Sequence, residues 1–96
     1  EHRRRNPYYR YQLALQAYRA QDYDAAIDHL KYAIGKRVNE DRFYYLLGVC
    51  YLRKGDQRAA GRWLARAEEV AATDALKRRY SNKIDALLHP HDPDQP

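Results

Sequence analysis

The sequence predicts an all-α protein of about five helices with antiparallel neighbours, and two observations support this prediction. The first is composition: only four Gly and four Pro occur in 96 residues, and three of the Pro lie in the last seven, so the body of the chain is almost free of helix breakers. Alanine, leucine, arginine and glutamine, which favour helix, are abundant there. The second is an internal period of 34 residues, in which each copy carries the apolar spacing of two helices.

The period emerges when residues 7–40 are placed over residues 41–74, because eight identities then align without a gap. They pair Tyr11 with Tyr45, Leu13 with Leu47, Arg19 with Arg53, Asp22 with Asp56, Ala25 with Ala59, Ala26 with Ala60, Leu30 with Leu64 and Ala33 with Ala67. A repeat of this length marks one supersecondary unit stacked on a copy of itself, so we expect the two segments to fold alike.

In residues 41–74 the first helical face is predicted at three- and four-residue steps by Tyr44, Leu47, Gly48 and Tyr51. That helix should end near Gly55, which tolerates the left-handed conformation, and Asp56 should cap the next helix. A second apolar face follows at Ala60, Leu64 and Ala67. The earlier unit has the same plan, with the residues Leu13, Ala14, Ala17, the cap Asp22, and then Ala26, Leu30 and Ala33. The short side chains in both units should let paired helices approach closely.

This pattern resembles the tetratricopeptide repeat, a 34-residue helix-turn-helix unit. Residues 41–74 match it in register, with Tyr44 in place of the usual Trp. Residues 7–40 match less fully, since the family's aromatic, Gly and Tyr are replaced by Arg10, Ala14 and Ala17. The family's closing Pro is absent from both units, at Val38 and Ala72, which leaves the turns between units less sharply defined. The resemblance implies an α-α superhelix of helical hairpins.

The remaining segments complete the expected organisation. Residues 75–88, after a cap at Thr73 or Asp74, should form a capping helix, since a solenoid must cover its last apolar face. Its apolar stripe is Leu76, Tyr80, Ile84, Leu87 and Leu88, and its polar side includes Arg78, Arg79 and Lys83. Residues 1–6 form a basic extension before Pro7, which suits a first helical position. The polar, Pro-rich residues 89–96 are predicted to be a disordered tail.

By the resemblance, the first helix of each unit and the capping helix line a concave groove that binds peptide segments. The corresponding positions are Tyr8, Tyr11, Leu15, Tyr18, Arg19, Arg42, Tyr45, Val49, Leu52, Arg53, Leu76, Arg79 and Lys83. Tyrosine rings give a large contact area at low entropic cost, and arginine binds carboxylates through paired hydrogen bonds. The expected partner is therefore a protein segment with apolar or aromatic anchors and acidic groups.

Alternatives stand beside this interpretation. Each tyrosine could simply pack against neighbouring helices, and each arginine could be solvated. The Lys and Asn residues with which related repeats clamp a chaperone's terminal carboxylate are missing, because their places hold Tyr11, Leu15 and Val49. A chaperone-tail clamp is therefore not expected.

Other chemistries find little support. The sequence has no Gly-rich phosphate loop and no arrangement of Ser, His and Asp, so neither an enzyme nor a cofactor is expected. Cys50, the single cysteine, should be a buried inert thiol. His29 has no partner in the sequence. The tract His89, His91 and Asp92 has the composition of a metal site, but in a loose tail it is expected to be solvated, so no metal is expected.

The formal charge of +5 leaves two further roles open. Nucleic-acid binding could use Arg3, Arg4, Arg5 and Arg10 beside Tyr8, Tyr9 and Tyr11, but the acidic residues spread through both units argue against it. An architectural role, as the self-assembling end of a longer array, would make a homo-oligomer through convex or end-on contacts of Tyr32 and Trp63. A protein-binding scaffold remains the leading hypothesis.

The compartment and the partner's identity are open. The chain begins at Glu1 and contains no Met, which indicates a trimmed or processed form. No apolar run approaches the ~20 residues that span a bilayer, so this fragment should hold no membrane span. The location would be cytoplasmic, or periplasmic if an upstream signal or anchor was removed. The arginine- and alanine-rich composition suggests a bacterial source.

Overall fold

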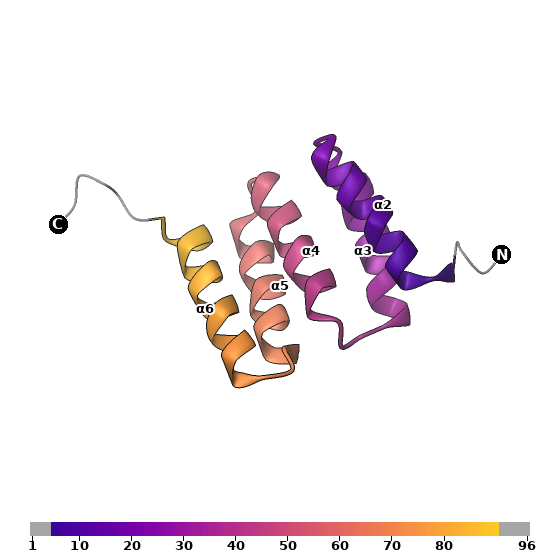
Figure 1. Ribbon diagram of the computed structural model, residues 1–96. Helices are drawn as coiled ribbons and strands as arrows, with labels where there is room; N and C mark the ends of the chain where they lie inside the picture. Colours follow the sequence, from indigo (N-terminus) through magenta and orange to yellow (C-terminus); the bar gives the residue numbers. More distant parts are fainter. Residues whose placement is uncertain (1–4, 91–96) are drawn as a thin grey trace.

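The computed structural model describes residues 5–90, and its five helices form two hairpins followed by a single helix (Figure 1). The first hairpin is α2 (Pro7–Arg19) and α3 (Tyr23–Lys36), and the second is α4 (Asp41–Arg53) and α5 (Gln57–Val70). The last helix is α6 (Asp74–Leu88), which stands beside α5. The described residues contain no strand, so the all-α prediction is confirmed. Most of the predicted extension and tail lies outside the described residues.

The helices begin where side chains satisfy their free backbone N–H groups. Asp22 accepts a hydrogen bond from the N–H of Ala25 at 3.2 Å, and Asp56 accepts one from Ala59 at 3.0 Å. These two aspartates occupy equivalent positions of the repeat, as the sequence predicted. The cap of α6 is Thr73, which accepts from Leu76. The cap position of α4 is Glu40, whose side chain makes no capping bond. Its carboxylate can therefore bind other side chains.

Each hairpin turn contains one residue with a positive φ. In the second hairpin it is Gly55, at φ +89°, as predicted. In the first hairpin the equivalent position is Gln21, at φ +62°. A non-glycine residue pays a steric penalty in this region. The two hairpins therefore share one turn geometry. Only the second hairpin has a glycine, which favours a positive φ, at this position.

The paired helices of the second hairpin touch at Gly48. A Cβ added there would lie 2.6 Å from Cγ of Leu64 and 3.1 Å from its backbone N. Leu64 is fully buried, as are Ala60 on the same helix and Ala14 at the position equivalent to Gly48. The short side chains thus permit the close approach that the sequence predicted.

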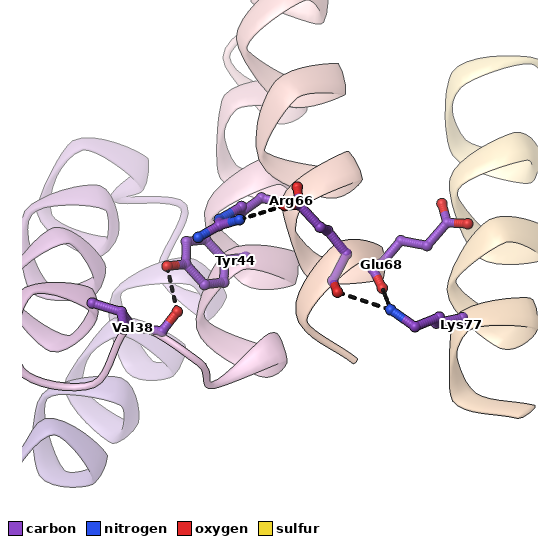
Figure 2. A network of polar contacts seen from close by, with 6 residues as sticks. Val38, Tyr44, Arg66, Glu68 and Lys77 are labelled. Carbon is purple, nitrogen blue, oxygen red and sulfur yellow. Dashed lines mark hydrogen bonds and ion pairs between the residues drawn. The ribbon is translucent and has the colours of Figure 1, made fainter. Parts of the chain in front are cut away.

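The turn between the hairpins is held by a hydrogen bond instead of a proline. The Tyr44 hydroxyl donates to the carbonyl oxygen of Val38 at 2.6 Å (Figure 2). The Tyr44 ring stacks on Trp63, with centroids 6.0 Å apart. A side chain from α4 therefore anchors this turn, in which the proline is absent.

The last helix is attached at two places. Lys77 donates to the carbonyl oxygens of Glu68 and Glu69 at 3.2 and 2.8 Å, so its charge compensates the C-terminal end of α5 (Figure 2). The Tyr80 hydroxyl donates to the carboxylate of Asp41, which ties α6 directly to α4. Burial, and then this bond, raise the pKa of Tyr80.

The outer side of α6 is polar. Arg78, Ser81, Asn82 and Asp85 are exposed on this side. In the 34-residue register they are equivalent to the α4 residues that pack on the following helix. A polar outer surface is what a terminal helix of a solenoid requires for solubility. Among the described residues, no helix is long and apolar enough to cross a membrane.

Candidate partner-binding face

The predicted groove residues all lie on α2, α4 and α6, and we call this set the predicted binding face. Exposed members are Tyr8, Arg19, Arg42, Arg53, Arg79 and Lys83. Half-buried members are Tyr11, Leu15, Tyr18, Tyr45, Leu52 and Leu76. Val49 is only 7% exposed and packs among neighbours that include Tyr18 and Tyr45, so it lies beneath the face and offers little contact area.

An aromatic cluster occupies the end of the face where α2 and α4 begin. The rings of Tyr8 and Tyr11 lie 5.7 and 5.3 Å from the ring of Phe43, between centroids. The guanidinium of Arg42 lies 5.7 Å from the Tyr8 ring and 5.6 Å from the Tyr11 ring, which is within cation–π range. Tyr8 is 37% exposed, so the cluster presents aromatic surface to solvent.

The charge of Arg42 is already compensated within the chain. Its Nε donates to Oε1 of Glu40 at 3.1 Å, and the Tyr8 hydroxyl donates to Oε2 of the same carboxylate at 3.0 Å. Burial alone would raise the pKa of Glu40, but the bonds from Arg42 and Tyr8 lower it below its ordinary value. The Glu40 side chain is only 16% exposed. Arg42 therefore supports the tyrosines and has less capacity for a partner's carboxylate than the sequence suggested.

The middle of the face joins α4 to α6. The rings of Tyr45 and Tyr80 lie 5.6 Å apart, and the Lys83 ammonium lies 5.3 Å from the Tyr45 ring centroid. Burial raises the pKa of Tyr45, so its hydroxyl stays neutral at physiological pH. Because Tyr80 is bonded to Asp41, the position of Lys83 over Tyr45 depends on the attachment of α6 to α4.

The far end of the face lies at the last turns of α2 and α4. Tyr18 packs beside Tyr23, with ring centroids 5.8 Å apart. A hydrogen bond with the Tyr18 side chain raises the pKa of Arg53. Arg19 and Arg53 are the last residues of their helices and make no ion pair with any described residue.

The sequence analysis did not predict a cluster on the first hairpin that consists of Arg10, His29 and Tyr32. The Nε of Arg10 donates to Nδ1 of His29 at 3.1 Å, which gives His29 a partner that the sequence did not reveal. The Arg10 guanidinium also lies 4.1 Å from the centroid of the Tyr32 ring. Burial, and then the charge of Arg10, lower the pKa of His29.

The repeat register could have revealed this cluster. Arg10, His29 and Tyr32 occupy the positions that Tyr44, Trp63 and Arg66 occupy in the second hairpin. There, the Arg66 guanidinium lies 5.7 Å from the ring of Tyr44. Both hairpins thus pair a cation with an aromatic ring at this place, but with the two residue types exchanged between helices.

The other candidate sites do not belong to the predicted binding face. Cys50 is fully buried, and burial raises the pKa of its thiol to about 11, as expected for an inert thiol. A surface depression of about 580 Å³ is lined by Gln57, Arg58, Leu88 and His89, none of which belongs to the predicted face. The tract with His91 and Asp92 lies outside the described residues, as do Arg3 and Arg4 of the nucleic-acid alternative.

Comparison with known proteins agrees with the architecture. A family model described as tetratricopeptide repeat matches residues 17–78, about two thirds of the chain. The search of curated proteins and the search of solved structures returned no match. Repeats of this kind generally mediate protein–protein interaction and are generally non-catalytic. With paired antiparallel helices, a 34-residue register and this match, the chain belongs to the tetratricopeptide repeat family.

Proposed function

We propose that the predicted binding face on α2, α4 and α6 binds a segment of another protein. The observation that supports this most is the row of tyrosines on successive first helices, partly exposed and bordered by cations. Such side chains combine an apolar ring with a polar tip and lose little entropy when they are covered. Because Val49 and its neighbours pack firmly beneath them, the rings are held in place before a partner arrives.

The neighbouring charges define what the segment should contain. Arg19, Arg53, Arg79 and Lys83 make no ion pair with the described residues. The neighbouring carboxylates of Glu40 and Asp41 already accept hydrogen bonds from tyrosines. A segment with apolar or aromatic anchors and acidic groups would therefore be complementary to the face. A basic segment would meet repulsion at four places.

The experiment is to select binders from a displayed library of random peptides and to measure their affinity for two variants. Tyr11→Ala removes a half-buried tyrosine from the face, and Tyr32→Ala removes a half-buried tyrosine from the other helix of the same hairpin. We expect Tyr11→Ala to weaken binding by about tenfold or more, and Tyr32→Ala to leave it unchanged. Selected peptides that depend on Tyr32 and not on Tyr11 would place the binding surface elsewhere. A thermal melt of each variant confirms that it is folded.

A further inference from the structure

The cations of the predicted binding face differ in whether the chain already neutralises them. Arg42 is paired with Glu40 at 3.1 Å. Arg19 and Arg53 are exposed and have no carboxylate within ion-pair distance among the described residues. The two ends of the face are therefore unequal, with a compensated arginine beside the aromatic cluster and two uncompensated arginines at the other end.

The carboxylates near Arg19 and Arg53 are committed to other groups. Asp22 and Asp56 accept hydrogen bonds from the backbone N–H groups that begin α3 and α5. Asp24 is paired with Lys54. Among the described residues neither arginine makes an ion pair, so both guanidinium groups can bind an external acceptor.

From this asymmetry, and resting on the proposed function, we infer that Arg19 and Arg53 form a paired subsite for two acidic side chains of the bound segment. The two arginines end consecutive first helices at equivalent positions of the repeat. Packed helices lie about 8–10 Å apart, and an extended chain advances about 3.3 Å per residue. Carboxylates about three residues apart would therefore match the two guanidinium groups.

Tyr18 lies beside this subsite. It directly precedes Arg19 in the chain, and its side chain raises the pKa of Arg53 on the next first helix. The Tyr23 ring, 5.8 Å away, supports Tyr18 from the next helix. The segment would then run across α2 and α4, with its acidic pair at their C-terminal ends.

A purely structural role makes a different prediction. A cation in the last turn of a helix interacts favourably with the helix dipole, and both arginines are in that position. In that role they would contribute to stability and would have no effect on which peptide sequences bind. Binding and stability measured on the same variants separate the two roles.

The test uses synthetic ten-residue peptides in which two glutamates are separated by one to five positions on a constant background of serine and tyrosine. Affinity for the full chain is measured by fluorescence anisotropy at two salt concentrations. The variants are Arg19→Glu, Arg53→Glu and, as a matched control for the charge change, Arg62→Glu, an exposed arginine on α5. A peptide series with lysine in place of glutamate is measured against the double variant that combines Arg19→Glu with Arg53→Glu.

We expect affinity to peak when the glutamates are three residues apart and to fall by about tenfold or more in each of the first two variants. Arg62→Glu should change it little, and the lysine peptides should bind the double variant better than the wild type. Peptides from the random library that depend on Tyr11 but show no acidic preference and no loss with Arg53→Glu would overturn this inference and leave the proposed function standing. If no peptide of either kind binds, both fail. Preferential binding of an oligothymidylate through the same arginines would also overturn it.

Discussion

Substitution of Gly48 by alanine tests the close contact on which the second hairpin depends. The added Cβ would lie 2.6 and 2.8 Å from two side-chain carbons of Leu64, whereas such carbons normally lie about 3.5–4.0 Å apart. Leu64 cannot move aside easily, because it is fully buried and its backbone N lies 3.1 Å from the same position. Relief therefore requires α4 and α5 to separate.

Two opposing effects determine how much Gly48→Ala changes the free energy of unfolding. Alanine in a helix interior is favoured over glycine by about 1 kcal/mol, which would stabilise α4. Forcing an extra carbon into a packed contact costs about 1–3 kcal/mol. The steric term is larger, so we expect a net loss of about 1 kcal/mol in the free energy of unfolding. For a domain of this size, that corresponds to a fall in Tm of about 4–8 °C.

The same chemical change on the facing helix serves as the control. A Cβ at Gly61 would meet only Cδ1 of Leu88, at an ordinary contact distance of 3.9 Å. Gly61→Ala should therefore keep the helical gain and raise the free energy of unfolding by about 0.5–1 kcal/mol. Both variants are compared by thermal and urea denaturation followed by circular dichroism. Equal, stabilising effects of the two substitutions would refute the close approach of α4 and α5 at Gly48.

Three further predictions address the turns and the first hairpin. Gln21→Gly should stabilise the chain by about 0.5–1 kcal/mol in urea denaturation, because glycine avoids the penalty of a positive φ. Tyr44→Phe should lower the free energy of unfolding by about 1–2 kcal/mol, because the carbonyl of Val38 loses its donor. His29, whose pKa is lowered in the folded state, should contribute stability above pH 6.5 that is lost as pH falls through the folded pKa, because the unfolded chain takes up the proton first. His29→Asn, which can still accept from Arg10 but does not titrate, should flatten Tm between pH 7.5 and 5.5.

Each of these predictions has a result that contradicts it. A destabilised Gln21→Gly variant would mean that the turn does not strain this residue. An unchanged Tyr44→Phe variant would mean that water satisfies the Val38 carbonyl equally well. If His29→Asn keeps the full slope of Tm against pH, other groups account for the acid sensitivity.

The pairing of Arg42 with Glu40 changes how the predicted binding face should be described. The sequence suggested that the arginines on this face bind acidic groups of a partner. The structure shows that Arg42 holds the rings of Tyr8 and Tyr11 while Glu40 neutralises its charge. Removal of Arg42 should therefore disturb the aromatic cluster of Tyr8, Tyr11 and Phe43.

The sequence by itself determined the helical hairpins and their boundaries. Asp22 and Asp56 act as caps, Gly55 takes a positive φ, and Gly48 allows close packing, all as the pattern predicted. These features depend on backbone geometry within a few residues or on the spacing of apolar positions in one helix. Both kinds of information are contained in the local order of residues, which is why they could be predicted.

The tertiary structure alone decided which polar side chains meet. The bonds from Tyr8 to Glu40 and from Tyr80 to Asp41 join residues 32 and 39 positions apart. The bond from Arg10 to His29 joins two helices through side chains. Long side chains reach several ångströms, so their partners depend on how far apart and at what angle the helices pack. That geometry results from the whole core, and no pattern along a single helix specifies it.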